Sequence, residues 1–296
     1  MLRAVDFKVN FFKVTTPSPN SNFGKILDFC SQWDEDADKR NHNRVPNIVR
    51  LQELIHDSGV WIGDMLWIDM TETALRADRQ GDVDPVKLAQ DQGIADTTAF
   101  LYDPKLNCLL LESSRPGVTK GRFRKFYSRL NRVKGEIELP TILTADAYQN
   151  MSNLNRVTKL AVKIAGGVNG QVVKDSERPV KSGLEIAEAL DAPELTLEIS
   201  VGRAWRNDEL NRSNVMTFVK DALSLSDNDD VRFDSMEVVG RNRREEREEI
   251  NLIKDKMQYE EEIQPNSDRT IPFNKRANAI ENAYRDKKSD LNNLFG

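Results

Sequence analysis

The sequence contains few of the residue types on which disulfide-rich scaffolds and many catalytic sites depend. It has 2 cysteines, Cys30 and Cys108, and 2 histidines, His42 and His56, among 296 residues. This cysteine content excludes a disulfide framework, and so few histidines exclude a histidine-rich metal site. With 15 glycines and 11 prolines, the chain is also neither fibrous nor of low complexity.

Long hydrophobic runs are missing as well. No apolar stretch reaches the roughly 18 residues typical of a membrane-spanning helix. The N-terminal residues 1–6 lack the basic and apolar regions of a signal peptide. We therefore expect a soluble, cytoplasmic protein. A hydrophobic content of 39% over this length is sufficient for a large core, in one large domain or two packed domains.

Enzyme motifs are weak throughout the sequence. The pair Gly24-Lys25 lacks the preceding glycine of a phosphate-binding loop, and the glycine-rich residues 166–170 lack the spacing of a dinucleotide-binding fingerprint. Asp84-Pro85 is not followed by the Glu-x-Lys strand of metal-dependent nucleases. We therefore predict a binding protein without catalytic residues, metal or cofactor, and keep a nuclease with a diffuse site as a minor alternative.

The pattern of apolar residues predicts an α+β fold with mixed or antiparallel sheets and packed helices. Residues 71–94 are polar and acidic and are expected to form a loop. A capping box is expected to begin a helix after Ser182. Strands are predicted at 4–14, 45–56, 60–70, 99–102, 108–111, 135–143, 157–165, 194–202, 231–240 and within 250–263, and helices at 22–32, 119–133, 183–190, 211–224 and 274–295.

The order of these elements indicates two lobes. Residues 1–144 are expected to form an N-terminal α+β lobe that contains a basic helix at 119–133. Residues 145–241 are expected to form a β-α-β-α-β lobe. Residues 242–296 are expected to add a strand and a helix that pack back on the N-terminal lobe.

The strongest chemical signal is a segment without acidic residues between Glu112 and Glu136. Its charge is +8, so the remaining residues sum to −13 in a chain of net charge −5. The basic residues are Arg115, Lys120, Arg122, Arg124, Lys125, Arg129, Arg132 and Lys134. On a helical wheel, the apolar residues lie on one side and most of these cations lie on the other. The apolar residues are Phe123, Phe126, Tyr127, Leu130 and Val133.

A helix of this kind can bury its aromatic side chains and present a row of cations to solvent. Such a row suits the phosphate oxygens of a nucleic acid and requires no base-specific geometry. We therefore predict that these eight residues contact DNA. Two other interpretations remain open: the helix is an ordinary solvated face, or it docks an acidic surface such as residues 227–230 or an acidic partner protein.

Two segments resemble the RexA-type phage-exclusion proteins. One is the C-terminal stretch from Tyr284 to Phe295, and the other combines Ala99–Tyr102 and Leu109–Leu111 with Pro116 and Phe126. A strand of the Val9–Phe12 kind is also similar to the beginning of related uncharacterised bacterial and prophage proteins.

This resemblance implies a two-lobed fold similar to that of the recombination inhibitor RdgC. It also implies a homodimer around a basic channel that binds DNA without sequence preference and acts in phage exclusion. A membrane or effector protein encoded nearby is a further expected partner. The resemblance supplies no catalytic motif, and the DNA-contact residues above are inferred from charge alone.

Overall fold

The protein is described from a computed structural model and consists of two compact units. Unit 1 combines Met1–Glu138 with Gln258–Lys288, and unit 2 combines Leu139–Met257 with Ser289–Gly296. The fold is mixed α+β with antiparallel sheets, which confirms the predicted class. The structure describes residues 3–17, 22–35, 38–44, 46–72, 74–77, 80–114, 117–130, 136–165, 180–202, 208–225 and 232–296.

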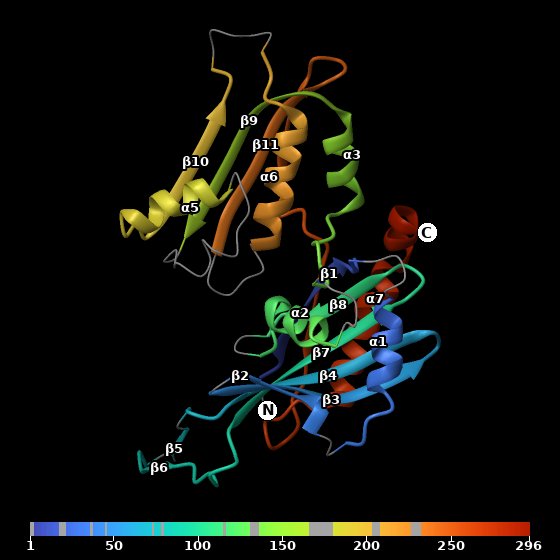
Figure 1. Ribbon diagram of the computed structural model, residues 1–296, viewed down its shortest axis with the longest axis vertical. Coiled ribbons are helices and arrows are strands. Elements are labelled where there is room, and N and C mark those ends of the chain that lie inside the picture. Colours follow the sequence, from blue (N-terminus) through green and yellow to red (C-terminus); the bar gives the residue numbers. More distant parts are fainter. Residues whose placement is uncertain are drawn as a thin grey trace. The chain divides into compact units, whose positions relative to one another are not determined.

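Unit 1 is built on a seven-stranded antiparallel sheet in the order β13-β1-β8-β7-β4-β3-β2 (Figure 1). Most neighbouring strands also follow one another in the sequence, as expected for a meander. The strands are β1 Val5–Lys13, β2 Asn41–Arg44, β3 Asn47–Asp57, β4 Val60–Asp69, β7 Ile94–Asp103, β8 Cys108–Glu112 and β13 Gln258–Ile263.

The strands predicted at 45–56 and 60–70, and those predicted at 99–102 and 108–111, pair as two antiparallel hairpins in this sheet. Ser58 and Gly59 join β3 to β4 with φ angles of 50° and 82°, the pair of left-handed residues found in a tight type I′ turn. Strand β8 lies between β1 and β7. All four of its residues from Cys108 to Leu111 are buried, as is typical of a central strand covered on both faces.

Helices cover both faces of the sheet. The helices α1 (Phe23–Cys30) and α2 (Lys120–Ser128) pack on one face, where Phe23 contacts Tyr102 and Phe123 contacts Phe100. The long helix α7 (Phe273–Phe295) packs on the other face through Arg276, which contacts Asp64 of β4. Adjacent residues on a strand point to opposite faces, so β7 contributes to both layers.

Unit 2 is a four-stranded antiparallel sheet in the order β10-β9-β11-β12, with α5 and α6 on one face (Figure 1). Leu160, Val162 and Ile164 of β9 alternate into its core, and Lys159 and Lys163 form ion pairs on the other face. The elements are α3 Ala145–Asn153, β9 Leu154–Ala165, α5 Val180–Ala189, β10 Glu194–Ser200, α6 Arg212–Leu225, β11 Arg232–Asn242 and β12 Arg247–Asn251.

The observed units differ from the expected boundaries at 144 and 241. The first boundary lies at Glu138, and the second lies at Met257. The difference arises because β12 pairs with β11 and so extends the sheet of unit 2, whereas β13 pairs with β1 in unit 1. Residues 242–257 therefore do not join the N-terminal part.

Several local predictions were wrong. The expected loop at 71–94 contains a two-stranded ribbon, β5 (Leu75–Ala77) with β6 (Val83–Pro85), because short alternating runs were too brief to recognise. The expected strand at 135–143 provides only isolated bridges, such as that between Glu138 and Thr15. Helix α5 begins at Val180, so Ser182 lies inside it rather than capping it.

No helix in the described ranges is long and apolar enough to cross a membrane. The glycine-rich residues 166–170 lie outside the described residues.

Candidate nucleic-acid interface

Helix α2 carries the predicted DNA-binding residues, but it is shorter than expected. Thr119 caps it by accepting a hydrogen bond from the amide of Arg122, and the helix ends at Ser128 rather than at 133. Of the eight predicted contact residues, Lys120, Arg122, Arg124, Lys125 and Arg129 belong to the described residues. Arg115, Arg132 and Lys134 lie outside them.

The predicted apolar side of α2 is confirmed for three of its five residues, whereas Leu130 follows the helix and is half-buried, and Val133 lies outside the described residues. Phe123, Phe126 and Tyr127 are all fully buried. Phe123 and Tyr127 contact Phe23 of α1, and Phe100 of β7 completes the cluster. Edge-to-face contacts of this kind add to the free energy gained from burying the rings, so the aromatic side fixes the orientation of the helix on the sheet.

The first two cations of α2 do not face solvent as predicted. Lys120 is buried, and its ammonium group lies 5.2 Å from the centre of the Phe12 ring. The guanidinium of Arg122 stacks 3.5 Å above Trp67 and donates a hydrogen bond to the carbonyl of Gly117. Helical periodicity alone could not reveal this, because both side chains bend over aromatic rings presented by the sheet.

The remaining described cations lie further along the helix. Arg124 is 3.4 Å from the carboxylate of Glu136, the residue that closes the acid-free segment. Arg129 is exposed, and its guanidinium donates to the carbonyls of Asn41 and Lys39 over 2.6 and 3.1 Å. Lys125 is half-exposed. The helix therefore offers fewer outward cations than the charge count predicted.

The partners of these cations decide how much positive charge remains available. A carboxylate neutralises the charge of its partner, whereas a carbonyl fixes a guanidinium in place and leaves its charge uncompensated. Arg129 is held by two carbonyls and by the ring of Phe126, whose centre lies 4.4 Å from its guanidinium, and Lys125 forms no ion pair among the described residues. The exposed Lys39 supplies one of those carbonyls, and its ammonium group lies 5.8 Å from the centre of the Trp33 ring.

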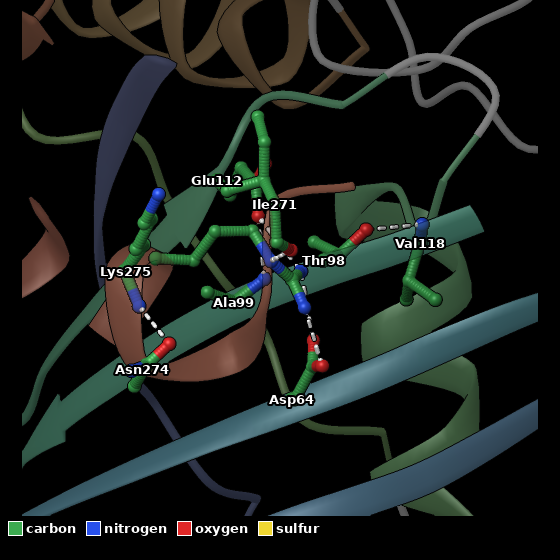
Figure 2. Close-up of polar contacts among 9 residues, drawn as sticks. Asp64, Thr98, Ala99, Glu112, Val118, Ile271, Asn274 and Lys275 are labelled. Atoms are coloured by element: carbon green, nitrogen blue, oxygen red, sulfur yellow. Dashed lines mark hydrogen bonds and ion pairs between the residues drawn. The ribbon is translucent and has the colours of Figure 1, made fainter. Parts of the chain in front are cut away.

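A cluster of buried polar side chains lies inside unit 1, between its sheet and α7. The guanidinium of Arg276 in α7 contacts Asp64 of β4 and Glu112 of β8, two residues labelled in Figure 2. Arg276 contacts both carboxylate oxygens of Asp64, at 3.0 and 2.6 Å, and lies 3.5 Å from Glu112. Glu112 also accepts a hydrogen bond from the amide of Ala99 over 2.7 Å.

Burial dominates the electrostatics of this group. It raises the pKa of Glu112 to about 7, although the Ala99 amide and Arg276 both favour the charged form. Burial also raises the pKa of Asp64, and the hydrogen bond from Arg276 opposes that rise. The group is enclosed, since Arg276 is 2% and Asp64 3% exposed, so it joins α7 to the sheet rather than meeting a ligand.

Further along the same helix, α7 makes another buried polar contact. The hydroxyl of Tyr284 donates to a carboxylate oxygen of Asp103 over 2.6 Å. The other oxygen of Asp103 accepts from the amide of Lys105 in the turn that follows β7. The contact thus connects α7 to the β7–β8 turn.

These buried polar residues were not predicted, although the sequence contains a signal for them. Asp64 interrupts the otherwise apolar residues 60–68, and Arg276 lies four residues before Ile280 and eight before Tyr284 on the apolar side of the last helix. A charged residue at a core position of a strand and one of opposite sign at a core position of a helix indicate a buried ion pair.

The fold and the site together define an α+β protein with two units and a cationic helix end in unit 1. A family model matches residues 5–292, so the chain belongs to the family described as Family of unknown function (DUF6731). Neither the curated proteins nor the solved structures contain a match to the chain.

Proposed function

We propose that this protein is a non-catalytic DNA-binding protein that contacts the phosphate backbone without sequence preference. The contacts are made by the end of α2, through Lys125 and Arg129 with Lys39 beside them. This set is smaller than the eight residues that the sequence suggested. The resemblance to RexA-type proteins supports a role in phage exclusion or antiviral defence, and it supports a homodimer.

One observation supports this proposal above the others. Arg129 is exposed and positioned by two neutral carbonyls, so it carries a fixed and uncompensated charge. A cation fixed before binding loses less side-chain entropy when it meets a phosphate than a flexible one does. The arginine contacts phosphate oxygens and not the edges of the bases. We therefore expect DNA binding that depends on salt concentration but not on base sequence.

The test separates the charge of Arg129 from its structural contacts. In the full chain, we compare Arg129→Gln, which removes the charge, with Arg129→Lys, which keeps the charge and abolishes the paired hydrogen bonds to the two carbonyls. Binding to a fluorescent duplex is measured by anisotropy across a salt series. Removal of one phosphate-binding cation is expected to reduce the slope of log K against log salt by about 1.

We expect Arg129→Gln to weaken binding and reduce that slope, and Arg129→Lys to retain both. Lys125→Gln should add a further reduction of similar size. The matched control is Lys8→Gln, because Lys8 is paired with Glu260 over 2.7 Å and contributes little free charge. Equal losses in the control and in Arg129→Gln would contradict the proposal. Binding of an acidic protein but not of DNA would favour a protein-interaction subunit instead.

A further inference from the structure

The hairpin that joins β11 to β12 lies at one end of the sheet of unit 2 (Figure 1). The amide of Glu245 donates to the carbonyl of Asn242 over 3.0 Å, and the amide of Asn242 donates to the carbonyl of Glu246 over 3.1 Å. Glu245 has a φ of 62°. The turn is therefore a three-residue loop closed by a left-handed residue, a common hairpin form.

This turn is held by a dense set of side-chain contacts. The side chain of Asn242 accepts hydrogen bonds from the amides of Arg244 and Glu246, over 2.8 and 3.1 Å. Arg241 donates to the carbonyl of Glu245 over 2.6 Å. A left-handed conformation is unfavourable for glutamate, and these contacts offset its cost. The loop is therefore fixed before any ligand arrives.

Each acidic side chain of the hairpin has a polar partner. Glu245 forms an ion pair with Arg156 of β9, and Glu249 forms one with Arg247 over 3.1 Å. The side-chain amide of Asn242 donates to Glu246 over 2.8 Å and to Glu248 over 2.9 Å. Arg156 and Arg247 therefore compensate the charges of Glu245 and Glu249, whereas Glu246 and Glu248 are held by a neutral amide.

The arginines at the tip have no such partners. Arg243 and Arg244 are exposed, and neither side chain forms a hydrogen bond or an ion pair within the part of the chain that the structure describes. Arg241 is exposed, and its side chain bonds a carbonyl and no carboxylate among the described residues. The charge count does not reveal these unpaired arginines, because residues 241–249 contain 4 arginines and 4 glutamates and have no net charge.

We propose that this hairpin is a second DNA-binding site, in which Arg243 and Arg244 contact phosphates and Arg241 supports them. The partner is a nucleic-acid duplex, because paired guanidinium groups on a narrow rigid turn match phosphate oxygens and fit beside a groove. The inference rests on the proposed DNA binding and assigns to it a contact in unit 2.

The experiment uses the full chain and a duplex of about 30 base pairs, with salt varied from about 50 to 200 mM. The test variant is Arg243→Gln with Arg244→Gln. The matched control is Arg247→Gln, whose arginine lies in the same hairpin but is paired with Glu249. A third variant, Arg243→Lys with Arg244→Lys, retains both charges. Circular dichroism checks the fold of each.

We expect the double glutamine variant to reduce the slope of log K against log salt by about 2, while the control and the lysine variant retain the wild-type slope. An unchanged slope in the glutamine variant, with binding still sensitive to Arg129→Gln, would overturn this site and leave the proposed function in place. Equal losses in test variant and control would also overturn it. A wild-type chain that does not bind DNA would remove both proposals.

Discussion

Arg276 is the residue on which the packing of α7 against the sheet of unit 1 depends most. Its guanidinium balances Asp64 in a site where both side chains are almost completely buried. A pair of this kind contributes little net stability relative to apolar residues, but removal of one partner leaves the other charge buried without compensation.

Replacement of Arg276 by Met fills a similar volume and removes the charge. We expect this change to lower the free energy of unfolding by about 3–5 kcal/mol at neutral pH, as measured by urea denaturation. Asp64→Asn in the same chain should recover part of the loss. Lys275→Met, at the neighbouring half-exposed position, should cost much less. A loss below about 1 kcal/mol for Arg276→Met would show that Asp64 is not buried as a charge.

Glu112 gives the same group a pH dependence. Its pKa rises on folding from an ordinary value of 4.5 to about 7, so the folded state favours the protonated form. The stability that this group contributes is therefore complete below pH 4.5 and is lost as the pH rises through 7. At about 1.4 kcal/mol per pKa unit, the loss is roughly 3 kcal/mol.

Glutamine imitates the protonated glutamic acid and can still accept the hydrogen bond from Ala99. We expect Glu112→Gln to flatten the dependence of unfolding free energy on pH between 4.5 and 7 and to equal or exceed the wild type in stability at pH 8. Urea unfolding at several pH values measures both effects. The exposed Glu260→Gln provides the control. Greater destabilisation of Glu112→Gln at pH 8 than at pH 5 would contradict the assignment.

At the scale of elements, periodicity predicted positions well and side-chain partners poorly. It placed the aromatic side of α2 correctly because burial depends on spacing along the helix. It failed for Arg122, whose direction depends on Trp67 in β4, more than 50 residues earlier in the sequence. Long cationic side chains bend toward nearby aromatic rings or carbonyls on other elements, and a helical wheel gives no information about those elements.

The β5–β6 ribbon and the contacts at the tip of the β11–β12 hairpin were also not predicted from the sequence. Strands β5 and β6 have three residues each, too few for alternation to stand out against a polar background. The β11–β12 hairpin was not predicted, and the contacts of its glutamates depend on Asn242, which binds two carboxylates across the turn. A count of charges along the sequence does not show which side chains are paired within so short a segment.

At the scale of the whole molecule, unit 2 is a nearly continuous insertion in the sequence of unit 1. The core of unit 2 lies entirely between Leu143 and Leu252. Unit 1 instead combines two segments, since residues 258–288 supply both β13 and most of α7. A chain of residues 1–138 alone would expose one face of its sheet and leave Asp64 and Glu112 without Arg276.

We therefore expect residues 139–257 to fold when produced alone, with a cooperative thermal transition and dispersed NMR signals, because this segment contains its own core. Residues 1–138 alone should lack such a transition. Joining residue 138 to residue 258 through a short glycine-serine linker should restore it, because β13 and α7 then cover the sheet and return Arg276 to its carboxylates. Cooperative folding of 1–138 without the C-terminal segment would show that the meander is stable without α7, and the buried ion group would then have no structural role in unit 1.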